Sequence, residues 1–517
     1  MQRIGLVDRF FGPVVSCAAM QIPLERGTDG SGRGAPVYQQ IAGWLRAEIE
    51  AGRLGPGDRL PTIRALARQL GVNRDTVALA YEALAREGWL ESTVGRGTFV
   101  RRPPEAPAPP PFEPVLSPLV ERLLDFERAR VRYAAPPGTV PLHSLVPDPA
   151  LYPGDEFRRA LARAMARSGN DLLRYGQPQG HPGLREVLAA RLRAAGVPVG
   201  PDEVVVTQGA SEGIALALRL FAAPGDVVAV EEPTYHNVLA TLAALGLRVA
   251  PVAMRDGAPD LGALERALER PDVKLFYTMP SFHNPLGTSS DLAHRRALLA
   301  VAARTGKPVI EDAYEMDLRF AGKPVPSLAA LDERGLVVQL FSFSKSLFPG
   351  ARVGSIAARG RVVEALLALK HASDLGGALV LQAALADFVA GGGYDRHLSR
   401  MRRVLRARCD ALLEALAREM PDGVRWPEPE GGLQLWVELP EFVDTAELLP
   451  EAVRAGVLFA PGFQFRSDPR PSSGLRLSIA MAGEEEIRRG VRALGRVVRE
   501  RLRAGEALPA AADDARV

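Results

Sequence analysis

Apolar residues at helical spacing mark the first patterned segment of the chain, between residues 36 and 100. They predict three helices, the first through 37–49, the second from Pro61-Thr62 to Gly71, and the third from Asn73, a good N-cap, to Gly88. Two short strands around Gly95-Arg96-Gly97 are expected to follow as a hairpin. Helix, helix, turn, helix and hairpin in this order predict a winged helix-turn-helix. The apolar positions that carry the pattern are Val37, Ile41, Leu45, Ile49, Leu66, Leu70, Val77, Ala80, Tyr81 and Leu84.

Polar residues at the start of the third helix and at the hairpin tip suit contact with DNA, because they can reach base edges or phosphates. Residues 36–102 hold ten Arg against seven Asp or Glu, and this excess of +3 equals the formal charge of the whole chain. A solvated basic surface is the alternative for any single arginine, but the arrangement predicts DNA binding. The candidate DNA contacts are Arg64, Asn73, Arg74, Asp75, Thr76 and Arg96.

Three stretches of this module resemble the DNA-binding domain of GntR-family regulators. They are LPTIRALA at 60–67, GVNRDTV at 71–77 and GRGTFV at 95–100, and together they cover nearly the whole module.

The segments on either side of the module lack a folding pattern. Residues 1–35 are predicted to be an unstructured leader, and residues 506–517 an unstructured tail. Residues 101–118 are rich in proline, which favours an extended spacer and predicts a domain boundary.

Residues 119–505 alternate helical stretches with short, continuous apolar runs. Such runs are typical of strands buried on both faces, as in a mainly parallel α/β sheet. Ligands of these sheets bind beyond the carboxyl ends of the strands. The runs are 204–206, 227–230, 274–277, 308–310 and 337–340.

The residues after each run form a consistent set of chemical groups. The first run is followed by a small-residue turn at Ala210 and Ser211 that opens a helix and can hold an anion. The others are followed by an aromatic ring, an amide, a carboxylate with a phenol, and a serine-rich lysine with an arginine beyond it. These groups are Tyr235, Asn284, Asp312, Tyr314, Ser342, Ser344, Lys345 and Arg352.

Pyridoxal 5′-phosphate is one ligand that needs all of these groups. Its aldehyde condenses with a lysine amine, its phosphate needs amide, hydroxyl and arginine donors, and its ring nitrogen needs a carboxylate. The chain has five lysines, Lys274, Lys307, Lys323, Lys345 and Lys370. Two of them precede proline in turns, one begins a strand and one lies on a mixed helix, so Lys345 is the candidate at a strand's carboxyl end.

Residues 140–500 resemble a fold-type I aminotransferase, with a mainly parallel sheet and a smaller C-terminal α+β subdomain. The resemblance implies that Lys345 forms the Schiff base, Asp312 pairs with the ring nitrogen and Tyr235 stacks on the ring, the three forming the catalytic set. It also implies that Asn284 and Tyr314 bond the phenolic oxygen and that Arg476 clamps a substrate carboxylate. The implied phosphate ligands are Ala210, Ser211, Ser342, Ser344, Arg352 and, from the partner subunit, the residue matching Tyr175.

The order of winged helix, proline-rich linker and aminotransferase-like domain resembles MocR-type (PdxR-like) GntR regulators. Tyr314, two residues after Asp312, fits this branch. Two departures are Phe282-His283-Asn284-Pro285, which looks more like a competent aminotransferase, and Gln434, where the regulators often have histidine.

Composition narrows the remaining choices. The chain of 517 residues is 47% hydrophobic and 24% charged, a globular balance. Two cysteines cannot build a disulfide framework or a cysteine-rich zinc site, and no apolar run is long enough to span a membrane, so we expect a cytoplasmic protein.

Three hypotheses about function follow. The first is a homodimeric transcriptional regulator that binds operator DNA and senses an amino compound through aldimine exchange at Lys345. The second is a working aminotransferase with an appended DNA-binding module. The third is a repressor whose large domain is an inert dimerisation scaffold, which the pairing of Lys345 with Asp312 argues against.

Overall fold

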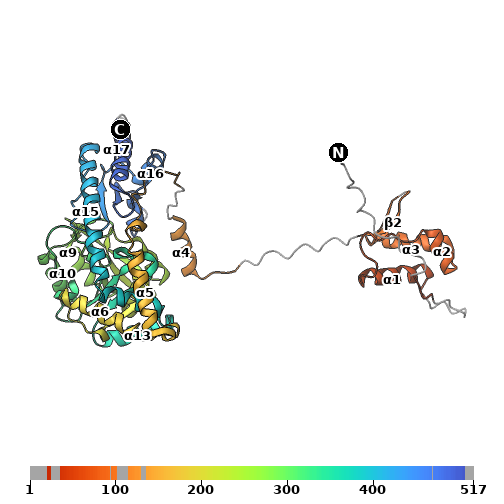
Figure 1. Cartoon of the computed structure of the whole chain (residues 1–517). Helices are drawn as coiled ribbons and strands as arrows, with labels where there is room; N and C mark the ends of the chain where they lie inside the picture. Colours follow the sequence, from red (N-terminus) through yellow and green to blue (C-terminus); the bar gives the residue numbers. More distant parts are fainter. Residues whose placement is uncertain are drawn as a thin grey trace. The chain divides into compact units, whose positions relative to one another are not determined.

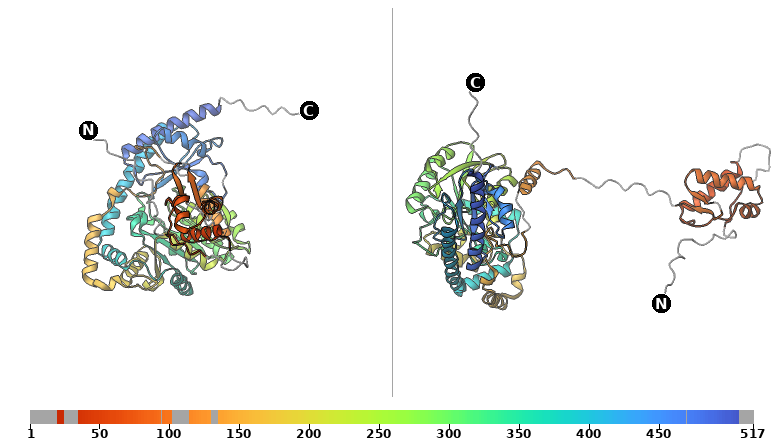
Figure 2. Two further views of the ribbon diagram at one scale, coloured as in Figure 1. Left: turned by 90° about the vertical axis from the view of Figure 1, so that its right-hand side faces the viewer. Right: turned by 90° about the horizontal axis from the view of Figure 1, so that it is seen from above.

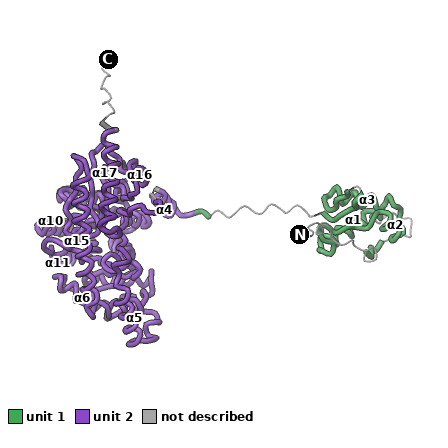
Figure 3. Tube along the Cα trace, turned by 45° about the horizontal axis from the view of Figure 1, so that its top comes forward, with its two compact units in different colours: residues 1–115 green, residues 116–517 purple. Residues whose placement is uncertain are grey.

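The computed structural model describes residues 20–24, 35–93, 95–101, 114–129, 135–468 and 470–506. The chain forms two compact units, Met1–Val115 and Leu116–Val517, so their boundary falls inside the predicted linker (Figure 3). Most of the leader, linker and tail predicted from sequence lies outside the described residues, at 1–19, 25–34, 102–113 and 507–517. No helix in the described ranges is long and apolar enough to cross a bilayer.

The first unit is a winged helix-turn-helix, as predicted (Figure 1). Thr62 and Asn73 cap the second and third helices, each accepting a bond from a backbone N–H of the first turn. Gly71 ends the second helix in the left-handed conformation. Leu45 and Leu66 are fully buried in the core of this unit. Its elements are α1 (Val37–Glu50), α2 (Ile63–Leu70), α3 (Arg74–Arg86), β1 (Leu90–Thr93) and β2 (Gly97–Val100).

Part of the predicted leader is packed against this unit. Met20 is 1% exposed and Ile22 is 7% exposed, and both belong to the core of the winged helix. The Gln69 side chain also donates a hydrogen bond of 2.6 Å to the carbonyl of Met20. The prediction of an unstructured segment is therefore wrong for residues 20–24. The sequence did not reveal this packing, because two buried apolar side chains form no periodic pattern.

The second unit is built on an eight-stranded sheet in the order β3-β10-β9-β8-β7-β4-β5-β6. All pairings are parallel except those of β10 and β6, so the sheet is mainly parallel, as predicted. The strands are β3 (Val204–Thr207), β4 (Val227–Glu232), β5 (Arg248–Arg255), β6 (Ala258–Pro259), β7 (Val273–Thr278), β8 (Val309–Asp312), β9 (Val337–Ser342) and β10 (Gly354–Ala357).

Helices cover both faces of this sheet, because alternate residues of each strand point to opposite sides. Val205 faces a core that includes residues of α7, α8 and α13, whereas Val204 and Val206 face the larger core on the other side. The helices of this domain are α4 (Pro118–Ala129), α5 (Gly154–Ser168), α6 (Pro182–Ala194), α7 (Ala210–Phe221), α8 (His236–Ala244), α9 (Leu261–Leu268), α10 (Leu292–Thr305), α11 (Leu328–Leu331), α12 (Phe343–Ser346), α13 (Arg361–Ser373) and α14 (Leu379–Ala390).

The C-terminal part forms the smaller α+β subdomain that the sequence predicted. Its antiparallel sheet has the order β11-β13-β12. The long helices α15 and α17 pack along each other (Figures 1 and 2). The elements are α15 (Gly393–Glu419), β11 (Gln434–Glu438), α16 (Thr445–Arg454), β12 (Ala460–Pro461), β13 (Gly474–Ser478) and α17 (Glu484–Glu506).

Candidate functional site

The carboxyl ends of the parallel strands meet at a cavity of about 210 Å³. Ten of the eleven residues predicted to bind the cofactor line it, and Tyr175 is the exception. The ten are Ala210, Ser211, Tyr235, Asn284, Asp312, Tyr314, Ser342, Ser344, Lys345 and Arg352.

Lys345 reaches this cavity from α12, the short helix after β9. Its Nζ donates a hydrogen bond of 3.0 Å to the carbonyl of Leu145. Burial lowers the pKa of Lys345, and the nearby carboxyl of Glu315 opposes that shift. A lysine with a lowered pKa is neutral over a wider pH range, which makes its amine available as a nucleophile.

Asp312, at the end of β8, is the buried carboxyl of the cavity. It is 2% exposed, and its Oδ2 accepts a hydrogen bond of 2.7 Å from the hydroxyl of Tyr277. Its Oδ1 is buried and has no hydrogen-bond partner among the described residues. Burial raises the pKa of Asp312 to about 6, although the bond from Tyr277 acts in the opposite direction. A cationic or neutral N–H donor placed at Oδ1 would satisfy the hydrogen-bonding capacity of this carboxyl.

Other residues of the cavity present donors for an anion. Ala210 and Ser211 begin α7, where backbone N–H groups are not used by the helix. The Arg352 guanidinium donates a bond of 3.0 Å to the carbonyl of Gln208. A Cβ on Gly209 would lie 3.1 Å from that guanidinium, and Gly209 has φ +79°, so glycine suits this position. The hydroxyl of Ser342 already accepts a bond of 3.2 Å from the N–H of Ser344.

Aromatic and amide groups complete the wall. The Tyr235 hydroxyl accepts a bond of 2.7 Å from Asn237, which also lines the cavity. The hydroxyl of Tyr314 accepts a bond of 3.0 Å from the Gln434 amide. That amide also donates to the carbonyl of Phe282, 2.9 Å away, so β11 is joined to the segment that carries Asn284.

Arg476 lies beside this wall and is not among the residues that line the cavity. It donates bonds of 2.9 Å to Oδ1 of Asn284 and 2.7 Å to the carbonyl of His143. Its guanidinium also lies 4.9 Å from the centre of the Phe465 ring. Burial lowers the pKa of Arg476 to about 10. The contact with Asn284 couples the candidate carboxylate clamp to the candidate cofactor ligand.

Four residues at or near the cavity were not predicted from the sequence. Tyr277 was read only as part of an apolar strand, and Leu145 and Asn237 carry no signal of their own. Glu315 is 0% exposed and accepts a bond of 3.2 Å from the N–H of Leu433. Burial raises the pKa of Glu315 to about 8, with Lys345 opposing the rise.

Tyr175 does not reach the cavity of its own chain. Its side chain is 86% exposed, and Leu173 beside it is 66% exposed. Large apolar side chains exposed side by side are typical of a protein contact surface.

Most of the predicted DNA contacts are exposed in the first unit. Arg64, Arg74, Asp75 and Arg96 are exposed, and Thr76 is half-buried. Asn73 is exposed, but its side chain is engaged as the cap of α3, with a bond of 3.3 Å from the N–H of Asp75.

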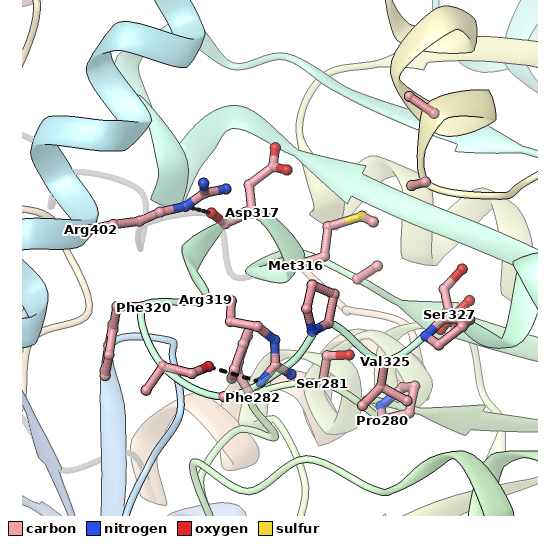
Figure 4. Close-up of a pocket in the computed structure, with 18 residues that line it drawn as sticks. Pro280, Ser281, Phe282, Met316, Asp317, Arg319, Phe320, Val325, Ser327 and Arg402 are labelled. Carbon is pink, nitrogen blue, oxygen red and sulfur yellow. Dashed lines mark hydrogen bonds between the residues drawn. The ribbon is translucent and has the colours of Figure 1, made fainter.

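A second and larger cavity, of about 600 Å³, is lined in part by Phe282 (Figure 4). Its charged groups are occupied by protein partners: Arg402 donates to the carbonyl of Asp317 at 2.7 Å, and Arg319 pairs with Glu430. The Arg319 guanidinium lies 5.0 Å from the centre of the Phe282 ring. This cavity therefore offers no set of reactive groups comparable to that of the first one.

Comparison with known proteins agrees with this two-part organisation. Residues 37–100 match the family of bacterial regulatory proteins, gntR family, and residues 150–494 match aminotransferase class I and II. The chain is 34% identical over 472 residues to YdcR of Escherichia coli, described as an uncharacterized HTH-type transcriptional regulator, covering 90% of this chain and 99% of the relative. It is 33% identical over 468 residues to MocR of Rhizobium meliloti, described as a probable rhizopine catabolism regulatory protein, covering 89% and 93%.

Among solved structures, α-aminoadipate aminotransferase LysN of Thermus thermophilus, complexed with N-(5′-phosphopyridoxyl)-L-leucine, superposes with a TM-score of 0.67. It is 32% identical, and the match covers 75% of this chain and 96% of that one. The winged helix, the fold of the large domain and the relatives matched over nearly their whole length lead to one conclusion: the chain belongs to the MocR-type GntR-family transcriptional regulators, in which a GntR helix-turn-helix is joined to an aminotransferase class I and II domain.

Proposed function

We propose that the large domain binds pyridoxal 5′-phosphate at Lys345 and senses an amino compound that competes with Lys345 for it, so that the ligand controls binding of operator DNA. The observation that carries this proposal is the meeting of Lys345 and Asp312 at one cavity, where Asp312 has a buried oxygen without a partner among the described residues.

The residues of the cavity fit this cofactor. When bound, it supplies an aldehyde that condenses with amines and a protonated ring that withdraws electrons. Asp312 would hold the ring-nitrogen proton at its unpartnered Oδ1. Tyr235 would stack on the ring, and Asn284 and Tyr314 would bond its phenolic oxygen. The phosphate would be bound by the amides of Ala210 and Ser211, by the hydroxyls of Ser342 and Ser344, and by Arg352.

Lys345 in the cavity and Arg476 beside it also suit an amino compound with a carboxylate. The lowered pKa of Lys345 supports its role as an amine that can be displaced and then move a proton. Arg476 would bind the carboxylate, a bidentate contact for which its guanidinium is suited. The ligand can act on transcription only if it binds one domain arrangement better than another.

We also propose that the regulator is a homodimer. The exposure of Tyr175 and Leu173 supports a contact with a second copy, through which Tyr175 would reach the partner's phosphate site. A two-fold assembly would match paired half-sites in the operator.

An active aminotransferase is the second candidate, favoured by the complete set of cavity residues around Lys345. One titration separates the candidates. The purified protein is mixed with amino acids and amines while its visible absorbance and its binding to promoter DNA are recorded together. Ligand-dependent DNA binding without steady turnover of amino donor and 2-oxo acid supports the sensor, and sustained turnover supports the enzyme. If the Lys345→Ala variant kept both the visible band and the ligand response, the assignment of Lys345 would be wrong.

A further inference from the structure

Lys370, on α13, is a buried lysine outside the cavity. Its residue is 1% exposed, and its Nζ lies 2.9 Å from Asp374 and 3.2 Å from Glu212. The two carboxylates are 13% and 18% exposed at their side chains. Desolvation offsets much of the attraction between buried charges, so a buried cluster of this kind depends on close, well-formed contacts.

The two carboxylates of this cluster hold Gln208, the residue before Gly209 in the turn that precedes α7. Glu212 accepts a bond of 2.6 Å from the backbone N–H of Gln208, and Asp374 accepts one of 2.8 Å from its side-chain amide. The carbonyl of Gln208 in turn accepts the bond from Arg352. The backbone N–H and the side-chain amide nitrogen of Gln208 are therefore bonded to the Lys370 cluster, and its carbonyl is bonded to Arg352.

The cluster also reaches the segment that carries Tyr175. The second carboxylate oxygen of Asp374 accepts a bond of 2.8 Å from the N–H of Gly376. A Cβ on Gly376 would lie 3.0 Å from the carbonyl oxygen of Gly176 and 2.9 Å from that of Gln177, so the two segments are in close contact. Leu375, next to Gly376 in the sequence, is also an exposed apolar residue, at 53%.

We propose that Lys370 is a positioning residue that holds the turn at 207–211 in the shape that binds phosphate and ties this turn to the Tyr175 segment. The inference rests on the proposed function, because it takes that turn as the phosphate site and the Tyr175 segment as a contact with a second copy. In addition, cofactor binding and self-association stabilise each other through this cluster.

The charge balance gives the physical reason. Glu212 and Asp374 bring two negative charges close to the turn, and Lys370 is the cation that both carboxylates contact. Without Lys370 the two carboxylates repel each other and an incoming phosphate, and Gln208 loses its fixed acceptors.

The test uses the full-length protein, freed of cofactor by dialysis against hydroxylamine, and the variants Lys370→Met and Asp374→Asn. Lys323→Met, which removes an exposed lysine, is the matched control. Equilibrium dialysis measures the affinity for pyridoxal 5′-phosphate, and sedimentation velocity measures self-association with and without it. We expect Lys370→Met to weaken cofactor binding by about tenfold or more. We also expect the cofactor to lose its effect on self-association, while the visible band of the bound fraction keeps its position.

Asp374→Asn keeps the shape of the cluster and is expected to show the same two losses, of cofactor affinity and of the effect of cofactor on self-association, in milder form. This variant tests the proposal if Lys370→Met does not fold. Wild-type cofactor affinity in a folded variant would overturn the proposal, and so would weakened affinity with an unchanged effect of cofactor on self-association. The control separates the two levels of inference. If the unmodified protein and Lys323→Met bind no cofactor, the proposed function itself fails, whereas normal binding there with unaffected variants refutes only the role of Lys370.

Discussion

The substitution Asp312→Asn should stabilise the cofactor-free protein at neutral pH while weakening its binding of pyridoxal 5′-phosphate. Burial raises the pKa of Asp312 from 3.8 to about 6, so the folded state disfavours the ionised carboxyl. This destabilisation is absent well below pH 3.8, where the carboxyl is protonated in both the unfolded and the folded state, and it grows until the pH passes the folded pKa. The full effect corresponds to about 3 kcal/mol at pH 8, since each unit of pKa is worth about 1.36 kcal/mol. It falls to about 0.5 kcal/mol at pH 4.

Asparagine keeps the size of Asp312 and an oxygen that can accept the bond from Tyr277, but it carries no charge to desolvate. Urea unfolding of the cofactor-free protein, followed through the transition of the large unit at pH 4 to 8, measures the difference between variant and wild type. Asp125→Asn is the control, because the side chain of Asp125 is 72% exposed and its loss should change little at any pH. An Asp312→Asn variant that is less stable than wild type at pH 8, or whose advantage does not grow with pH, would refute the reasoning.

Three further predictions address the other parts of the molecule. Arg476→Lys cannot keep both the Asn284 and His143 contacts, so amino acids should bind about 10- to 100-fold more weakly while amines without a carboxylate are unaffected, as a spectral titration would show. Gln434→Leu removes the amide donor to Phe282 and Tyr314 and should lower the free energy of unfolding by about 1–3 kcal/mol in urea melts. Arg74→Ala should weaken operator binding and lower the slope of log affinity against log salt by about 1, whereas Arg86→Ala at the other end of α3 should leave the slope unchanged.

Local patterns in the sequence were sufficient to predict most of the fold. The winged helix follows from periodicity and caps, since Thr62 and Asn73 occupy the cap positions that their residue types favour. The buried strands follow from continuous apolar runs. The antiparallel strand β10 was not predicted, because Gly354–Ala357 begins with a glycine and a serine and so shows no continuous apolar run, and because its place between β3 and β9 depends on distant pairing. Met20 and Ile22 were missed for the same reason.

The candidate site was predictable where its residues follow strands. Lys345 and Asp312 stand directly after buried runs, and the topology brings strand ends together. The groups that come from elsewhere were not predictable as partners. Leu145 meets Lys345 across 200 positions of sequence, and Gln434 meets Tyr314 across 120. Such contacts are set by the tertiary packing of segments far apart in the sequence, which no local pattern records. The buried charge cluster of Lys370 shows the same limit, since its helix gave no sign that the lysine faced inward.

Buried polar atoms without a partner among the described residues gather near the candidate site. Asp312, Glu315, Gln434 and Arg476 each keep one buried polar atom without a hydrogen-bond partner among the described residues. Folded proteins satisfy most such atoms, so a group of them near one cavity marks a place where a bound molecule would add hydrogen bonds. Gln434 and Arg476 lie on β11 and β13, whereas Asp312 ends β8 and Glu315 follows it, so these atoms come from both subdomains. A ligand that paired with atoms from both subdomains would bind more tightly in the arrangement that brings both sides to it. It would therefore favour this arrangement by its differential affinity, which is the property that a sensor of amino compounds requires.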